Sequence, residues 1–202
     1  RENVFGMNAS ILMNPRVWEA SGHLAAFTDP LVECKKCNLR FRADQNEEIG
    51  AHEETHKSRG EKTEWTEPKT FNLMVEAELG IVEGEKDKVY LRGEITQGVH
   101  VNFKNIMDSM HPKIPFGVAQ TGKAFRNEIT PGNFTYRLRE FEQMELQYYV
   151  RPDEKQAAEA FEMWKEERMK WFLLLGLDEN KLRFIEHAPD EKAHYARAAW
   201  DI

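Results

Sequence analysis

The first half of the chain alternates between short apolar stretches and polar turns. Residues 70–82 alternate in part between apolar and polar positions and predict a strand. A turn at residues 84–87 separates it from a second strand at Val89-Tyr90-Leu91. Residues 97–110 then place their apolar positions on one side of a helix, until Pro112 interrupts the pattern.

Two longer alternating stretches, residues 117–129 and 134–150, predict another pair of strands. Between them lies Thr130-Pro131-Gly132-Asn133, a run of residues that favour tight turns. Strands joined by so short a turn normally pair with each other, so this region predicts a β-hairpin.

The clearest helix covers residues 153–175. Asp153 supplies an N-cap oxygen, and Gly176 is the kind of residue that commonly follows the last helical turn. One apolar face is approximated by Ala157, Phe161, Trp164, Met169 and Phe172.

Residues 34–66 differ from their surroundings, because they are polar and charged and carry paired cysteines and paired histidines. They predict a small insertion between two parts of a core, residues 1–33 and residues 67–202. Strands and helices in irregular order, without an internal repeat, predict an α+β fold built on an antiparallel sheet flanked by helices.

Composition and charge narrow the function classes. With 41% hydrophobic and 31% charged residues, the chain of 202 residues suits a folded soluble protein of one or two domains. The longest apolar run, residues 171–175, is too short for a bilayer, and no signal-peptide pattern opens the chain. The net charge of −7 argues against a general nucleic-acid coat but leaves a local basic face open. We therefore expect a cytoplasmic protein with no membrane and no DNA partner.

The cysteines and two of the histidines have the spacing of a metal site. Two residues separate Cys34 from Cys37, and three separate His52 from His56, which places the histidines one helical turn apart. Thiolates and imidazoles at this spacing suit tetrahedral Zn²⁺, and so short a segment would take its folding energy from the metal. The alternative is two free thiols and two surface histidines. The prediction is a structural Zn²⁺ in the insertion.

Further features of the insertion fit a small ββα finger, whose core positions Phe41 and Ile49 would occupy. A single finger inside a larger protein more often stabilises the structure or contacts RNA than recognises DNA. A protein built from DNA-reading fingers would need more fingers and a basic charge. The remaining histidines, His23 among them, have no partner at ligand spacing.

The predicted hairpin carries many charged side chains, namely Arg126, Glu128, Arg137, Arg139, Glu140, Glu142 and Glu145. Alternation places Arg126 and Glu128 on one face, and it groups Arg137, Arg139, Phe141, Gln143 and Glu145 on one face. Burying such charges is costly unless they meet a ligand. The ligand implied has phosphates, an aromatic base and a cationic group, which ATP and an amino acid provide.

The same segment closely resembles motif 2 of class II aminoacyl-tRNA synthetases in its glycyl form, with FRNE at 125–128 and REFEQME at 139–145. Further stretches resemble the dimeric, single-chain glycyl-tRNA synthetases: NASILMNPRVWEASGH, FNLM, YLRGEITQGVHVNFKNI, PFGVAQTGKAFRNE and AHYARAAWDI. Together they run from about Asn8 to Ile202. The resemblance implies a class II synthetase core and a glycine–tRNA ligase that forms glycyl-adenylate from glycine and ATP.

The resemblance also implies roles for the hairpin residues in binding ATP. Arg126 would grip the α-phosphate and act catalytically, Glu128 would fix the adenine amino group, and Phe141 would stack on the adenine ring. Arg137 would hold the outer phosphates, with Arg139 supporting the site. Guanidinium groups suit phosphate because they bind it through two parallel hydrogen bonds. Mg²⁺ would bridge the phosphates.

For glycine, the resemblance implies that Glu94 and Glu145 hold the ammonium group, with Gln97 and Arg92 shaping the pocket. A pocket closed over the α-carbon would reject larger amino acids by clash. The partners implied are glycine, the tRNA for glycine and a second copy of the chain in a homodimer.

The chain departs from the family pattern in several places. Gly93 stands where the family usually has proline, and Gln147 stands where it often has a carboxylate. The glycine-rich motif 3 and the anticodon-binding domain are not found, and the family's zinc site commonly uses more cysteines. We therefore expect a fragment of a longer enzyme, inactive on its own if motif 3 is needed. The alternative is a non-catalytic tRNA-binding or regulatory relative.

Overall fold

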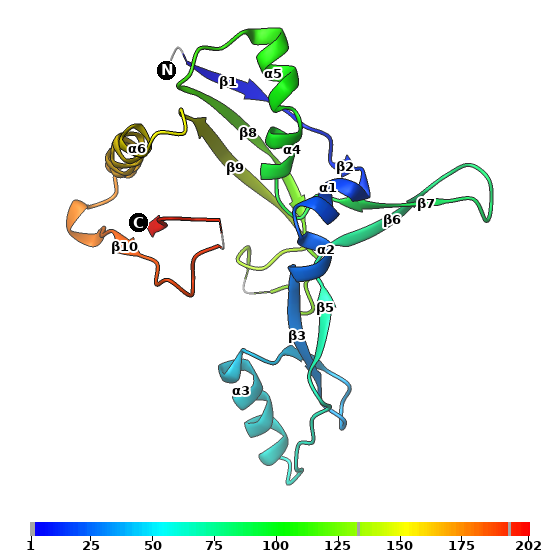
Figure 1. Ribbon diagram of the computed structural model, residues 1–202. Helices are drawn as coiled ribbons and strands as arrows, with labels where there is room; N and C mark the ends of the chain where they lie inside the picture. Colours follow the sequence, from blue (N-terminus) through cyan, green and yellow to red (C-terminus); the bar gives the residue numbers. More distant parts are fainter. Residues whose placement is uncertain (1–2, 133, 194) are drawn as a thin grey trace. The chain divides into compact units, whose positions relative to one another are not determined.

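The computed structural model describes residues 3–132, 134–193 and 195–202. The chain forms two compact units, Arg1–Tyr148 and Tyr149–Ile202, and each is described by itself. Short strands and helices mix along the chain (Figure 1), so the predicted α+β class is confirmed. The expectation of one antiparallel sheet is corrected, because the described strands form several small sheets.

The sheet that carries the predicted hairpin has the order β1-β8-β9. Its strands are β1 (Val4–Met7), β8 (Phe116–Phe125) and β9 (Glu140–Tyr149). β1 runs parallel to β8, whereas β8 and β9 run in opposite directions (Figure 1). Burial alternates along β9, with Phe141, Gln143 and Glu145 partly buried and Glu140 and Glu142 exposed, as the alternation predicted.

The strands of this hairpin end earlier than expected. Residues 126–139 form a long connection in place of the short turn, and Asn133 of that turn lies outside the described residues. Pro131 has no N–H for a strand ladder, and a single bridge joins Gly132 to Arg137. Arg126 and Glu128 of the first predicted strand, and Arg137 and Arg139 of the second, therefore lie on this connection. Their side chains do not follow the alternation of a strand.

A second sheet has the order β2-β7-β6, formed by β2 (Leu12–Met13), β6 (Val75–Leu79) and β7 (Asp87–Leu91). The single strand expected over residues 70–82 is wrong, because the stretch divides into β5 (Lys69–Asn72) and β6, which lie in different sheets. Asn72 causes the break: its Oδ1 accepts a hydrogen bond from the Met74 N–H at 2.7 Å, which turns the chain between the two strands.

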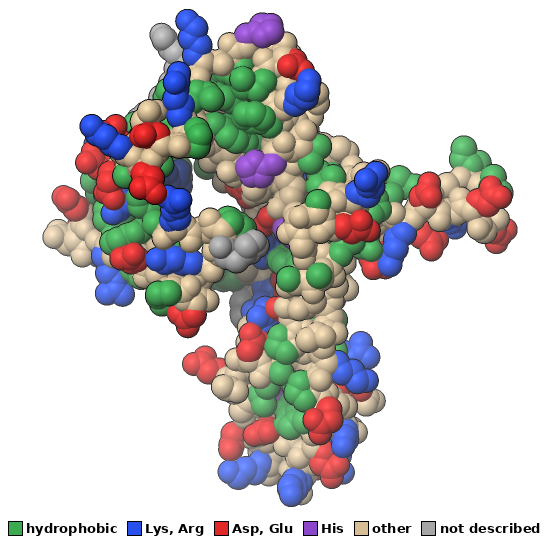
Figure 2. Space-filling model, viewed as in Figure 1, with side chains coloured by type: hydrophobic (Ala, Val, Ile, Leu, Met, Phe, Trp, Pro, Cys, Tyr) green, Lys and Arg blue, Asp and Glu red, His purple; other side chains and the backbone are tan. Residues whose placement is uncertain are grey.

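The third sheet, β4-β3-β5, carries the cysteine- and histidine-bearing segment. It contains β3 (Thr28–Glu33), β4 (Arg40–Arg42) and β5 (Lys69–Asn72), and α3 (Asn46–Lys57) follows β4. Acidic and basic side chains are interspersed around the end of this segment on the face shown in Figure 2. That face therefore has no large patch of one charge.

Four further helices of the first unit are short: α1 (Pro15–Ala20), α2 (His23–Ala26), α4 (Thr96–Val101) and α5 (Phe103–Met110). The helix expected over 97–110 is interrupted at Asn102, whose side-chain amide donates to the Gly98 carbonyl at 2.9 Å. The core beside α1 and α2 contains Trp18, Met74 and Tyr90, with Met13, Leu24 and Phe27 packed against it.

The second unit is built on α6 (Glu154–Leu174), with a 3₁₀ turn at Glu179–Lys181 and the paired strands β10 (Ile185–Glu186) and β11 (Trp200–Asp201). The predicted caps of α6 are confirmed: Asp153 accepts from the Gln156 N–H, and Gly176 has φ +88°. Across the described parts of the chain, no helix has both the length and the apolar character that a membrane span requires.

Candidate functional site

The first feature of the site is a carboxylate at the start of α4. Glu94 Oε1 accepts a hydrogen bond from Gln97 Nε2 at 2.6 Å and lies 3.3 Å from His23 Nε2. The hydrogen bond from His23, helped by Gln97 and by the charge of Arg126, outweighs burial and holds the pKa of Glu94 below its usual value. Glu94 is therefore ionised at neutral pH and presents a fixed negative charge.

A second carboxylate, Glu145, is held by Thr96, the residue next to Gln97 at the start of α4. Glu145 on β9 accepts from the Thr96 hydroxyl and from Gln147 Nε2, the latter at 3.3 Å. Gln97 Oε1 is buried and has no hydrogen-bond partner. Buried acceptors are normally satisfied, so this oxygen suits a donor group on a ligand.

Arg92 occupies a different environment from the one expected of a pocket residue. It is almost fully buried, and it donates to the main-chain carbonyls of Lys123 at 2.7 Å and Ala9 at 2.9 Å. Burial lowers the pKa of this guanidinium. Its bonds tie the segment before α4 to β8, so Arg92 supports the frame that carries Glu94.

Arg126 lies between two aromatic rings. Its guanidinium carbon is 5.2 Å from the ring centre of Phe27 and 5.1 Å from that of Phe141, and its Nε donates to the Gly93 carbonyl at 3.3 Å. A guanidinium held over two rings keeps its plane fixed while its terminal nitrogens remain available. The arrangement suits a preset anion-binding group.

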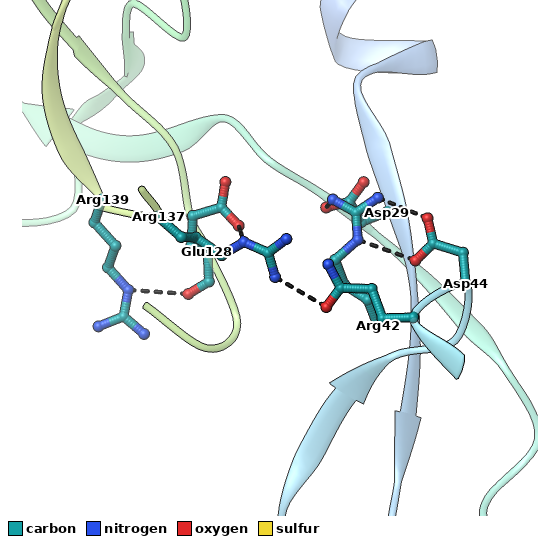
Figure 3. Close-up of polar contacts among 7 residues, drawn as sticks. Asp29, Arg42, Asp44, Glu128, Arg137 and Arg139 are labelled. Atoms are coloured by element: carbon teal, nitrogen blue, oxygen red, sulfur yellow. Dashed lines mark hydrogen bonds and ion pairs between the residues drawn. The ribbon is translucent and has the colours of Figure 1, made fainter. Parts of the chain in front are cut away.

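The other hairpin residues lie close to residues 34–66, the segment that carries the cysteines and histidines and is called the finger segment below. Arg137 donates to Gln45 Oε1 at 3.0 Å and lies 4.0 Å from Glu128, while Arg139 Nε donates to the Glu128 carbonyl at 3.0 Å (Figure 3). Gln45 is the N-cap residue of α3 and makes no side-chain cap there. Arg137, which is predicted to hold the outer phosphates of ATP, is thus oriented by the segment that carries the cysteines and histidines.

On the finger side of this contact, Arg42 organises two carboxylates (Figure 3). Its guanidinium donates to Asp29 at 2.6 Å and to both oxygens of Asp44, at 3.0 and 2.7 Å. The hydrogen bond from Arg42 lowers the pKa of Asp44. A cavity of about 660 Å³ lies between the two segments, lined by Phe41 and Arg40 on one side and by Asn127, Glu128 and Arg139 on the other.

Gly93, which precedes Glu94, is tightly surrounded. A Cβ on Gly93 would lie 2.9 Å from Cε1 of Phe27 and 3.1 Å from Sδ of Met74. The Phe27 ring therefore occupies the space that a larger residue at position 93 would need. Because that ring also contacts Arg126, the choice of glycine is linked to the geometry of the site.

Gly93→Ala is expected to destabilise the protein by about 1–3 kcal/mol, because the added methyl group must displace Phe27. Thermal unfolding checks this. The matched control is Gly50→Ala in α3, where a Cβ meets no atom within 4 Å; it should be neutral or stabilising by up to about 1 kcal/mol. Adding Phe27→Leu to Gly93→Ala should recover part of the loss. Equal unfolding temperatures for Gly93→Ala and the unchanged chain would contradict the crowding.

The cysteines and histidines singled out by their spacing gather at one point. The ligand atoms of Cys34, Cys37, His52 and His56 all lie within 4.8 Å of one another. Sγ of Cys37 is 3.4 Å from Nε2 of His52, and Sγ of Cys34 is 3.8 Å from Nε2 of His56. A tetrahedral Zn²⁺ with standard bond lengths sets such sulfur–nitrogen edges at roughly 3.5 Å. The donor set therefore fits Zn²⁺ in chemistry and in spacing.

Neighbouring residues support this arrangement. Glu61 Oε2 lies 2.6 Å from Nδ1 of His56, the contact that fixes Nε2 as the metal-facing nitrogen in many zinc sites. Phe41 packs its ring against His52 at 4.7 Å and against Trp65 at 5.6 Å. The cysteine and histidine spacing did not predict roles for Glu61 and Trp65, because neither residue is part of the ligand pattern.

Sequence reasoning also missed three residues that contact the two carboxylates or Arg126, namely His23, Phe27 and Thr96. No local signal marks them, because His23 and Phe27 reach these partners only through the fold of α1 and α2. His23 and Thr96 lie in stretches that resemble the family, which was the one available hint for these two residues.

No protein-family model matches the chain. The glycine–tRNA ligase of Treponema denticola is 47% identical to it over 201 residues, which cover 100% of this chain and 44% of that protein. The glycine–tRNA ligases of Alkaliphilus oremlandii and Geobacillus kaustophilus are 45% and 43% identical, over 98% of this chain and 47% of each protein. The chain thus spans somewhat under half the length of the curated relatives it matches.

Among solved structures, the RNA binding domain of threonyl-tRNA synthetase from Cryptosporidium parvum Iowa II aligns with 91% of this chain and 31% of that chain. The TM-score is 0.41 and the identity 18%, a likeness too weak to support an argument. The sequence matches, by contrast, confirm the resemblance to glycyl-tRNA synthetases along the whole chain.

Proposed function

We propose that this chain, which is similar along its whole length to glycine–tRNA ligases, supplies the part of such an enzyme that binds glycine and ATP. The observation that carries the proposal is the pair of carboxylates, Glu94 and Glu145, held by adjacent residues of one turn next to Arg126. An anionic pocket beside a preset guanidinium suits an amino acid whose carboxylate must meet a phosphate.

Glycine would place its ammonium group against Glu94, Glu145 and the unpartnered oxygen of Gln97. Each of these groups accepts hydrogen bonds, as an ammonium with three donors requires. The lowered pKa of Glu94 keeps its charge in place at neutral pH. Arg92 would not contact glycine and would instead hold in place the backbone before Glu94.

ATP would lie along the 126–139 connection and the start of β9. Arg126 would hold the α-phosphate, and the face of Phe141 turned away from Arg126 would stack on adenine. Glu128 would accept from the adenine amino group, with Arg137 on the outer phosphates and Arg139 in support. This placement rests on the motif resemblance and on the guanidinium geometry described above.

In the proposed reaction, a glycine carboxylate oxygen attacks the α-phosphorus and the bond to pyrophosphate breaks, which yields glycyl-adenylate. A terminal ribose hydroxyl of the tRNA then attacks the glycyl carbonyl, and AMP leaves. Arg126 stabilises charge on the phosphorus oxygens, so catalysis is by positioning and electrostatics. Mg²⁺, when bound, would neutralise phosphate charge. Structural Zn²⁺, glycine-specific tRNA, a homodimeric enzyme and a cytoplasmic setting complete the proposal.

The test is glycine-dependent ATP–pyrophosphate exchange by the chain, with binding of a non-hydrolysable glycyl-adenylate analogue measured alongside. Exchange or analogue binding with glycine, and neither with the alanyl and seryl counterparts, would support the proposal. A chain that catalyses no exchange but binds the glycyl analogue would still possess the pocket. Failure of both assays would favour the alternative, a non-catalytic relative that binds tRNA.

A further inference from the structure

His23 joins the end of α1 to the predicted glycine pocket. Its Nδ1 lies 2.9 Å from the Ser21 hydroxyl oxygen, and its Nε2 lies 3.3 Å from Glu94 Oε1. The imidazole thus bridges a hydroxyl on one side and the pocket carboxylate on the other. Neither Ser21 nor His23 belongs to the residues that the family resemblance places around glycine.

The ring is fixed by its surroundings. Its centre lies 5.2 Å from the ring centres of both Trp18 and Phe27, at tilts of 65° and 56°. The side chain is 13% exposed. Asn72 Nδ2 donates to the His23 carbonyl at 2.9 Å, which holds the backbone as well. A side chain restrained at ring and backbone can set the position of its partner.

The two contacts decide which nitrogen donates. A neutral ring with its proton on Nε2 donates to Glu94 and accepts from Ser21 at Nδ1, and a protonated ring also donates to Glu94. The other neutral tautomer would point a lone pair at a carboxylate, which is unfavourable. In both favoured states His23 therefore donates to Glu94, and the hydrogen bond helps to keep that carboxylate ionised.

The bond also leaves one oxygen of Glu94 for a ligand. His23 and Gln97 both address Oε1. Among the residues that the structure describes, none donates to Oε2. Two contacts on one oxygen restrain the carboxylate and leave Oε2 as the oxygen that can accept from an ammonium group.

We propose that His23 is a positioning residue for amino-acid recognition, which orients Glu94 so that Oε2 receives the ligand's ammonium group, with Ser21 holding the ring. This inference rests on the proposed function of the pocket. It predicts that His23 affects binding of the aminoacyl part of the intermediate and leaves the nucleotide part unaffected.

The experiment compares His23→Leu with His23→Gln by calorimetric titration of the whole chain. The probes are ATP and the glycyl sulfamate analogue of glycyl-adenylate. His23→Leu removes the donor, and the analogue should bind about tenfold more weakly, the effect of losing one charge-assisted hydrogen bond. ATP affinity should stay within about twofold. His23→Gln keeps an N–H donor of similar reach and should recover most of the loss, and Ser21→Ala should have a smaller effect than His23→Leu.

The control is His100→Gln, on the exposed side of α4, which should bind both probes as the unchanged chain does. Thermal unfolding of each variant separates misfolding from loss of positioning. Equal weakening of ATP and the analogue in His23→Leu, or unchanged analogue binding, would overturn the role of His23. If the unchanged chain binds neither probe, the proposed function itself fails, and the inference fails with it.

Discussion

Replacing Arg126 by alanine should slow glycine-dependent ATP–pyrophosphate exchange by about 10²–10³-fold, the usual cost of losing one charged or hydrogen-bonding group aimed at the transition state. The guanidinium lies over the rings of Phe27 and Phe141 and is tied to the Gly93 carbonyl, so its position is set before a ligand binds. Exchange kinetics at saturating ATP and glycine measure the effect.

Two further variants refine this expectation. Arg126→Lys keeps the charge but loses the planar group that stacks between two rings, so it should recover only part of the rate. Arg183→Ala removes an exposed arginine of the second unit and should leave exchange unchanged. Exchange by Arg126→Ala at the unchanged rate, with normal thermal unfolding, would remove Arg126 from the catalytic role.

Removal of the proposed Zn²⁺ should unfold the segment around α3. Apparent binding energies of structural Zn²⁺ sites are about 10–16 kcal/mol, and a segment with few buried apolar side chains has no comparable source of stability. Within residues 34–66 the buried side chains are two of the candidate ligands, Cys34 and His56. Chelation, or Cys34→Ser, should therefore abolish amide-exchange protection in α3 while β8 and β9 stay protected.

Metal analysis provides the second measurement. One Zn²⁺ per chain is expected, and Cys34→Ser should lose it. Glu61→Gln, which weakens the contact to His56 and leaves the ligand set intact, should lower zinc affinity by about 10–100-fold. His100→Gln serves as the matched control with full metal content. Protection of α3 that is the same with and without metal would contradict a structural role for the site. Since Gln45 at the start of α3 orients Arg137, weaker ATP binding should accompany unfolding.

Local rules explain the parts of the fold that the sequence could predict. The ends of α6 follow from Asp153 and Gly176, because caps act on backbone groups within one helical turn. Alternation along β9 follows from the strand period, which needs no knowledge of the partner strand. The prediction of one strand over 70–82 was wrong because Asn72 accepts a hydrogen bond from the backbone N–H of Met74 and turns the chain. The alternation of apolar and polar residues carries no sign of such a turn.

The sequence by itself determined the two strands that became β8 and β9, the long helix, the mixed α+β class and the grouping of Cys34 and Cys37 with His52 and His56, because each depends on spacing along a short stretch. Only the tertiary structure decided that His23 meets Glu94, that Arg137 reaches Gln45 and that Phe27 fills the space beside Gly93. These contacts join segments far apart in the chain. They depend on sheet register and on the directions of side chains in three dimensions, which no local period encodes.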